Sequence, residues 1–550
     1  MATVSGYVEK IKYRNEENGY SILSVNSDGL DYVLVGTFPY ISEGDFIEAS
    51  GRDVEHPIYG DQIQVESYEL KAPEDTASME RYLGSGAIRG VGTALAARIV
   101  RRFKADTFRI IEEEPERLAE VKGISEKMAM AISDQMEEKK ELRQAMIFLQ
   151  EYGISMNLAV KIYHEYGPRM YGIVKENPYK LADDIPGVGF KMADEIAQRV
   201  GIFTDSDYRI KAGILYTLLQ ASAQGHTYLP KEELLRHGAE LLKVTEDAME
   251  KHLSDMQMER KLVIKQKGEK QCVYAAVYYY TELNVARMLH DLNIRGSMPE
   301  ENIQKKLEKI QESENIELDP LQAKAVMEAV NSGLLIITGG PGTGKTTTIN
   351  TIIRYFETED MEILLAAPTG RAAKRMTEAT GLEAKTLHRL LEAKPPEGYQ
   401  KNEENPLEGD VLIVDECSMI DIVLMNALLR AIPPHMRLVL VGDIDQLPSV
   451  GAGNVLRDLM DSGVCKVVRL TKIFRQAQSS RIIMNAHRIN EGLMPDLSNG
   501  KTTDFFFTEK EDPEEAVAEI VNLVQTKLSR YYQTPSSQIQ VLTPMQKGVV

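Results

Sequence analysis

The sequence has few cysteines, no long hydrophobic run and fewer basic than acidic residues. Its three cysteines, Cys272, Cys417 and Cys465, include no CxxC pair, which argues against a disulfide framework or a zinc site and favours a reducing compartment. No apolar run reaches the roughly 18 residues of a membrane-spanning helix, and the N-terminal MATVSGYVEKIKYRNEENGY lacks the apolar segment of a signal peptide. These features predict a cytoplasmic protein with no membrane partner.

The excess of acidic residues limits the ways in which the chain can bind nucleic acid. With 64 Lys and Arg against 83 Asp and Glu, the formal net charge is -19. Neutralising a phosphate backbone needs cationic side chains, so a uniformly basic binding surface is not expected. Any DNA site must be local or must use backbone amides. At 550 residues the chain is also too long for one hydrophobic core, so several domains are expected.

The residue patterns divide the chain into five segments. Residues 1–75 alternate as short strands separated by turns, which predicts a small, OB-like β-barrel. Residues 76–205 are all-α in pattern, and residues 206–300 follow the order helix, helix, helix, hairpin of a winged-helix-like domain. Residues 301–475 alternate fully apolar strands with helices, as in an α/β domain whose parallel sheet is covered on both faces. Residues 476–550 form the last segment.

The unit G-x-(G/S)-x-x-x-A-x-x-I occurs four times in the helical segment. The copies begin at Gly90, Gly123, Gly153 and Gly187, and each matches a helix-hairpin-helix whose glycines form the tight hairpin. The hairpin amides and the next helix N-terminus would face a phosphate, so the contact ignores base sequence and needs no lysine. The alternative interpretation is that all four copies are packing units or a protein-docking platform.

The four copies differ in their glycines and in the charges around them. The first and fourth contain GVG, with Gly92 and Gly189 as the second glycine, whereas the middle two contain GIS. A basic cluster surrounds the first copy: Arg89, Arg98, Arg101, Arg102 and Lys104. We therefore predict that the first and fourth copies contact DNA phosphates, through Gly90, Gly92, Gly187 and Gly189.

The stretch GGPGTGKT has the pattern of a phosphate-binding loop. It follows the apolar run LLIIT and precedes the helical TTTINTIIRYF, which is the strand, loop, helix context that the motif requires. We expect Lys345 to hold the β- and γ-phosphates of ATP, and the Thr346 hydroxyl to bind Mg²⁺. The predicted nucleotide-binding residues of this loop are Gly339, Gly340, Pro341, Gly342, Thr343, Gly344, Lys345, Thr346 and Thr347.

Two other apolar runs end in polar residues, at what would be the carboxyl edge of the same sheet. Asp415 and Glu416 follow DVLIV; we expect Asp415 to hold Mg²⁺ through water, and Glu416 to orient and deprotonate the attacking water. Gln446 follows RLVLVGDID, where its amide could contact the γ-phosphate or that water. Taken alone, Gln446 is more simply a surface-loop glutamine.

Together these segments resemble the RecD-like branch of superfamily 1 DNA helicases. The resemblance rests on LDPLQAKAV, GGPGTGKTT, APTGRAAKRM, TLHRLL, DECSM, GDIDQLPSVGAG and LTKIFRQ, which occur in the family's order. It implies that residues 301–475 form a first RecA-like motor domain and residues 476–550 the start of a second. The barrel and the hairpin repeats resemble the stand-alone, long-N-terminus members, which work without RecB and RecC.

The resemblance also implies roles for single residues. Gln322 matches the glutamine that contacts adenine, Arg475 matches an arginine that reaches the γ-phosphate, and Gln446 matches the residue that links the γ-phosphate to DNA. The positions that match the single-strand contacts of the first motor domain are Pro368, Thr369, Gly370, Arg371, Thr386 and His388.

The implied activity is that of an ATP-dependent DNA helicase that moves 5′ to 3′ on single-stranded DNA, with forked or 5′-tailed duplexes as substrates, in repair or recombination. Family members continue past QVLTPMQKGVV, where this sequence ends. We therefore expect a C-terminally truncated chain that binds ATP but unwinds DNA poorly. The alternatives are a DNA-binding scaffold whose ATPase switches affinity without unwinding, and a P-loop kinase of small molecules.

Overall fold

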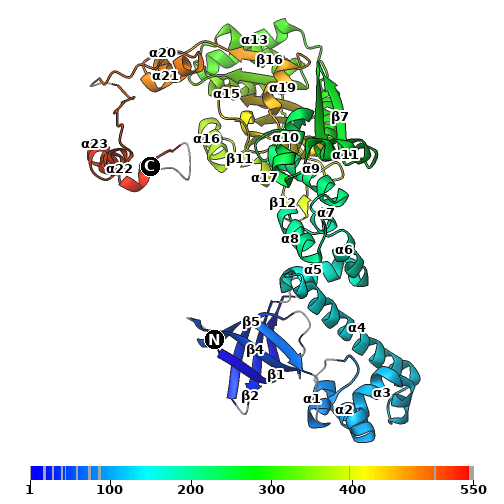
Figure 1. The fold of residues 1–550 in the computed structure, drawn as a ribbon. Coiled ribbons are helices and arrows are strands. Elements are labelled where there is room, and N and C mark those ends of the chain that lie inside the picture. Colours follow the sequence, from blue (N-terminus) through cyan, green and yellow to red (C-terminus); the bar gives the residue numbers. More distant parts are fainter. Residues whose placement is uncertain are drawn as a thin grey trace. The chain divides into compact units, whose positions relative to one another are not determined.

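The computed structural model describes residues 2–543, apart from residues 16–19, 28–29, 39–40, 42, 44, 57–59, 72–75, 85–87, 396 and 501–502. The chain forms two compact units, Met1–Thr217 with Pro230–Lys261 and Leu218–Leu229 with Leu262–Val550. Figure 1 follows the chain through both. No helix among the described residues is both long and apolar enough to cross a membrane.

The first unit begins with a closed five-stranded barrel in the order β1-β2-β3-β5-β4, as predicted for an OB-like domain (Figure 1). Alternate side chains fill its core, including Val8, Leu23, Leu34 and Phe38. The Phe38 ring is fully buried and packs against Tyr68 at 5.1 Å between ring centroids. The strands are β1 (Ala2–Arg14), β2 (Tyr20–Ser27), β3 (Leu30–Thr37), β4 (Phe46–His56) and β5 (Gly60–Lys71).

Eight helices follow the barrel and form two pairs of hairpin copies. The alanine and isoleucine of every copy are at most 3% exposed, as expected for residues that pack the two helices of a hairpin. Copies one and two share one hydrophobic core, and copies three and four share another. The helices are α1 (Thr76–Gly84), α2 (Thr93–Phe103), α3 (Thr107–Glu113), α4 (Glu126–Glu151), α5 (Met156–Tyr166), α6 (Met170–Glu176), α7 (Lys180–Asp184) and α8 (Phe190–Val200).

A buried ion pair joins the fourth copy to the next helix. Arg209 on α9 (Asp207–Ser222) donates to both carboxylate oxygens of Asp194 on α8, at 2.8 and 3.2 Å. The hydroxyl of Tyr179 donates to the same carboxylate at 2.7 Å. The side chains of Arg209 and Asp194 are only 10% and 14% exposed, so each charge needs the other to offset the cost of its burial.

The elements between the hairpins and the sheet follow the chain order of a winged helix. They are α9, β6 (Tyr228–Pro230), α10 (Lys231–Leu242), α11 (Glu246–Met258), β7 (Leu262–Lys267), β8 (Lys270–Ala275) and α12 (Ala276–Leu292). The hairpin predicted around KGEK is present, since β7 and β8 pair antiparallel up to Lys267 and Lys270. The strand β6, which the sequence did not suggest, adds to β8.

A six-stranded parallel sheet in the order β11-β10-β14-β15-β9-β16 forms the centre of the second unit. Every residue of β14 is buried, as expected for a strand covered on both faces. One core packs α12, α18 and α19 on the sheet, and another packs α13, α14, α15 and α16. The strands are β9 (Leu334–Gly339), β10 (Ile363–Ala367), β11 (Ala384–Thr386), β14 (Val411–Val414), β15 (Arg437–Gly442) and β16 (Lys466–Leu470).

The helices of this domain are α13 (Glu300–Glu314), α14 (Pro320–Asn331), α15 (Lys345–Glu357), α16 (Gly370–Thr380), α17 (Leu387–Leu390), α18 (Ile422–Ala431) and α19 (Val455–Asp461). Two short strands, β12 (Ala393–Lys394) and β13 (Gly398–Tyr399), form a separate antiparallel pair.

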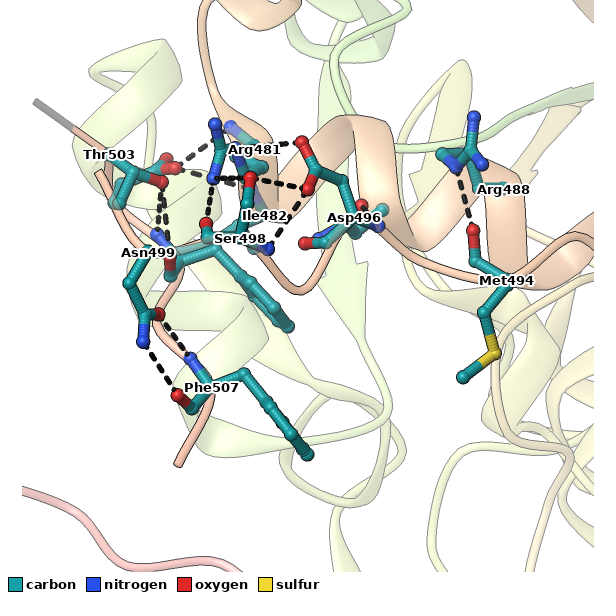
Figure 2. A network of polar contacts seen from close by, with 12 residues as sticks. Arg481, Ile482, Arg488, Met494, Asp496, Ser498, Asn499, Thr503 and Phe507 are labelled. Carbon is teal, nitrogen blue, oxygen red and sulfur yellow. Dashed lines mark hydrogen bonds and ion pairs between the residues drawn. The ribbon is translucent and has the colours of Figure 1, made fainter. Parts of the chain in front are cut away.

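After β16 the described residues form helices and no strand. The helices are α20 (Arg475–Gln478), α21 (Arg481–Asn490), α22 (Pro513–Asn522) and α23 (Leu528–Tyr532). Figure 2 shows how polar contacts hold α21 and the segment after it: Arg481 pairs with Asp496, and Asn499 exchanges two hydrogen bonds with the backbone of Phe507. The start of a second RecA-like domain therefore stays a prediction.

Candidate active site and nucleic-acid interface

The phosphate-binding loop connects β9 to α15, so all nine loop residues singled out from the sequence lie together. Gly342 and Gly344 have φ of 76° and 82°, a left-handed backbone that favours glycine. A Cβ on Gly342 would lie 2.4 Å from the Cβ of Ala477, and one on Gly344 would lie 2.4 Å from Nε2 of Gln322. The loop therefore needs glycine for both conformation and space.

Lys345 and Gln322 are both bonded to the backbone of this loop. The Lys345 ammonium donates to the carbonyls of Gly339 and Gly340 at 2.5 and 3.2 Å. Gln322, only 2% exposed, donates to the carbonyl of Gly344 at 3.1 Å and accepts from the backbone N–H of Asp319 at 3.0 Å. Gln322 thus joins the start of α14 to the loop, where an adenine contact was predicted.

The two acids lie at the end of β14, and burial changes their chemistry. Burial raises the pKa of Asp415. Burial, and then the negative charge of Asp415, raise the pKa of Glu416, which makes Glu416 a stronger base. The backbone of Glu416 is left-handed, with φ of 55°, a conformation that costs a non-glycine residue about 1–2 kcal/mol. Such strain is concentrated at functional sites.

The residues present fit Mg²⁺ bound together with a nucleotide. Thr346, Asp415 and Glu416 line one cavity of about 90 Å³, which brings a hydroxyl and a carboxylate together. Within the described part of the chain, no cluster of three or more His, Cys, Asp or Glu side chains could hold a metal alone. Mg²⁺ typically binds through one or two protein oxygens and completes its shell with water and phosphate, so this sparse donor set suits it.

Gln446 lies at a second, larger cleft beside the loop. The cleft has a volume of about 540 Å³, and its walls include Gly339, Gly340, Pro341, Asp443, Gln446 and His487. The Gln446 amide donates to the buried carboxylate of Asp443 at 3.3 Å. Gln446 is exposed and lies in one cleft with the phosphate-binding loop, and its contact with the γ-phosphate stays a prediction.

Helix α21 contributes Ala486, His487 and Asn490 to the walls of this cleft, which the sequence did not predict. A ring nitrogen of His487 lies 3.1 Å from the carbonyl oxygen of Pro341, and no motif around His487 indicated this contact. Arg475 begins α20, but its side chain lies outside the described part of the structure. Its contact with the γ-phosphate stays a prediction.

The predicted single-strand contacts lie at the ends of two neighbouring strands. The strand β10 is followed by Pro368, Thr369, Gly370 and Arg371. Thr386 is the last residue of β11, and His388 lies two residues after it. The two strands pair in parallel, with Ala367 beside Thr386. Thr369 accepts from the N–H of Ala372, and Thr386 accepts from that of Arg389, each at 3.2 Å. These hydroxyls cap α16 and α17, so two helix N-termini lie side by side.

The four hairpins differ in what covers their glycines. Arg98 donates to the carbonyl of Lys122 in the second hairpin, and Arg199 donates to that of Tyr152 in the third, at 3.1 Å. A Cβ on Gly123 or Gly153 would meet one of these guanidinium groups. Each middle turn is therefore covered by an arginine from the other copy of its pair.

The first and fourth turns are open. Among the described atoms, nothing lies within 4 Å of a Cβ placed on Gly92, Gly187 or Gly189, and only Met128 lies within that distance of one on Gly90. The first and fourth copies are those predicted to bind phosphate. The basic cluster around the first copy is smaller than expected, because Arg98 faces the second turn and Arg102 pairs with Glu120 at 2.6 Å.

Four family descriptions match successive parts of the chain. They are the OB-fold domain of the ATP-dependent DNA helicase YrrC at residues 1–73, the SAM-like helix-hairpin-helix tandem at 85–137, the helix-hairpin-helix domain of ATP-dependent RecD2 DNA helicases at 138–228, and an AAA domain at 322–452. The ATP-dependent RecD2 DNA helicase of Deinococcus radiodurans is 31% identical over an alignment of 565 residues that covers 99% of this chain and 76% of that protein. The chain belongs to this family.

Two further comparisons cover less of the chain. The RecD subunit of the RecBCD enzyme from Mycolicibacterium smegmatis is 38% identical over 229 residues, which cover 36% of this chain and 41% of that protein. The Pif1 helicase of Candida albicans aligns over 38% of this chain and 55% of that one, at 22% identity and a TM-score of 0.27. The RecD-like resemblance is confirmed, and the small-molecule kinase does not fit a chain related to a RecD2 helicase over 99% of its length.

Proposed function

We propose that this chain hydrolyses ATP to move 5′ to 3′ along single-stranded DNA, with forked or 5′-tailed duplexes as its substrates. The observation that supports this most is the strand order β11-β10-β14-β15-β9. Along one edge of the sheet it lines up the predicted DNA contacts after β11 and β10, the two acids after β14, Gln446 after β15 and the phosphate-binding loop after β9. Nucleotide and single strand would thus share one continuous rim.

Each residue on this rim has a chemical task. Lys345 and Arg475 would neutralise charge on the β- and γ-phosphates, and Glu416 would take a proton from the attacking water. Thr346 and Asp415 would hold Mg²⁺, which withdraws negative charge from the phosphates when it is bound. Gln446, which is already bonded to Asp443, would contact the γ-phosphate. Gln322 would contact adenine.

The hairpins would provide a second set of DNA contacts. We infer that the open first and fourth turns contact phosphates through the backbone around Gly90, Gly92, Gly187 and Gly189, which requires no large positive charge. The covered second and third turns would serve packing alone. In this view, half of the repeats are binding units and half are structural.

Partners and cellular role stay predictions. The RecD subunit match covers 36% of the chain, whereas the RecD2 match covers 99%, which supports action without RecB or RecC. A role in DNA repair or recombination is implied only by the resemblance, and a location in the cytoplasm is predicted from the few cysteines and the lack of a signal segment.

Steady-state ATPase with and without a single-stranded oligonucleotide tests the core of the proposal, with Lys345→Ala as the blank. We expect strong stimulation by DNA. Polarity is then measured by displacement of streptavidin from biotin at either end of the oligonucleotide, and a 5′ to 3′ motor clears the 3′ end. Clearing only the 5′ end contradicts the polarity. Stimulated ATPase that clears neither end favours the ATP-switched scaffold.

A further inference from the structure

Arg375, to which the sequence analysis gave no role of its own within the motif APTGRAAKRM, shares a cavity with the two acids. Arg375 on α16 lines the cavity of about 90 Å³ that Thr346, Asp415 and Glu416 also line. Its positive charge acts on both carboxylates and opposes the effect of burial on the pKa of each. The cavity therefore contains two acids from one strand end and one cation from a neighbouring helix.

The Arg375 guanidinium has no partner among the residues that the structure describes, whereas the other basic residues of α16 do. Arg371 donates to Oε1 of Gln540 at 3.0 Å, and Lys374 lies 3.9 Å from a carboxylate oxygen of Glu378. An arginine that has no such partner and shares a cavity with two acids is available to form an ion pair with one of them.

The same helix carries predicted DNA contacts at its start. Arg371 and Arg375 are four residues apart, so they lie on one face of α16, one turn apart. Thr369 caps the helix, and Ala373 and Met376 bury its other face. A short, capped helix moves as one body, so a phosphate bound at its first turn changes the position of Arg375 relative to Glu416.

We propose that Arg375 is a positioning residue that couples DNA occupancy at the start of α16 to the orientation of the Glu416 carboxylate. The inference rests on the proposed function of this site as a DNA-stimulated ATPase. With DNA bound, Arg375 holds one carboxylate oxygen of Glu416, which leaves the other directed at the attacking water. Without DNA, the Glu416 carboxylate lacks this restraint.

The test compares Arg375→Met with the neighbouring Lys374→Met. Both substitutions remove one positive charge from the same helix, but Lys374 does not line the cavity. For Arg375→Met we expect the DNA-stimulated kcat, relative to the rate without DNA, to fall about tenfold, within the usual range of coupling between two sites. The KM for ATP and the Kd for single-stranded DNA should change less than about twofold, and Arg375→Lys should recover part of the loss.

Three outcomes overturn the proposal: equal losses in Arg375→Met and Lys374→Met, unchanged stimulation in Arg375→Met, or a loss explained by weaker ATP or DNA binding. Absence of recovery in Arg375→Lys would limit the role to the planar guanidinium and would still support positioning. The ATPase of the unaltered protein distinguishes failure of the proposed function from failure of this inference. If its ATPase ignores DNA, the site is not DNA-coupled, whereas normal stimulation with an unaffected Arg375→Met rejects the role of Arg375 alone.

Discussion

Replacing Gly187 with aspartate tests whether an open hairpin turn binds DNA phosphate. Gly187 has φ of 94° and open space around it, in the turn before α8. Gly201, the C-cap of the same helix, has φ of 89° and is equally open to the described atoms. Both substitutions place an L-residue at positive φ, at a cost of roughly 1–2 kcal/mol of stability. Gly201→Asp is therefore a matched control for strain and charge.

The expected loss of affinity follows from Coulomb's law. A carboxylate about 5 Å from a phosphate is repelled by about 0.8 kcal/mol in water and by about 3 kcal/mol at the effective dielectric constant of about 20 near a protein surface. Since about 1.4 kcal/mol is a factor of ten, Gly187→Asp should weaken binding by about 4-fold to about 300-fold. Gly201→Asp, at the opposite end of α8, should have little effect.

The assay is fluorescence anisotropy of a labelled oligonucleotide at low and moderate salt, together with thermal unfolding of each variant. The difference between the two variants should shrink as salt rises, because ions screen exposed charges. Equal weakening by Gly187→Asp and Gly201→Asp would refute the reasoning and favour the hairpins as packing units. Gly187→Ala, which adds strain without charge, should bind more tightly than Gly187→Asp.

Two further substitutions test the catalytic base and the buried ion pair. Glu416→Gln should retain ATP binding, measured with a fluorescent ATP analogue, but should lower hydrolysis at least about 100-fold because it cannot accept a proton; near-normal hydrolysis would exclude Glu416 as the base. Arg209→Met leaves the buried carboxylate of Asp194 without its charge partner and should destabilise the fourth hairpin by about 3–5 kcal/mol, measured by hydrogen exchange of α8 amides. Unchanged protection would show that the ion pair does not stabilise the junction.

Much of the fold follows from short-range patterns. The buried run VLIV of β14 could only suit a strand covered on both faces, and strand alternation in the first 75 residues predicted the barrel. The phosphate-binding loop was predictable because positive φ at Gly342 and Gly344 is a local requirement that few residues meet. The strand β6 was missed because its three residues carry no period and depend on β8 for pairing.

The site was predictable only in part. The sequence indicated that Asp415, Glu416 and Gln446 each end a buried strand, but the order of strands that places them along one edge is a long-range property. Arg98 and Arg199 stand at different positions of the repeat, so no pattern indicated that they cover the middle hairpins. Arg375 likewise lies in a motif whose predicted role was DNA contact.

The sequence by itself determined which groups are present: a glycine loop that suits phosphate, two adjacent acids at a strand end, and four hairpins whose glycines permit a tight turn. These features depend on the conformational limits of single residues and on side-chain type, which act within a few positions of the chain. Only the tertiary structure decided which hairpin turns are open, which cation shares a cavity with Glu416, and which side chains line the cleft beside the phosphate-binding loop. Those outcomes arise from packing between residues far apart in sequence. The burial and electrostatic environment of each side chain depend on neighbours that short-range sequence patterns cannot predict.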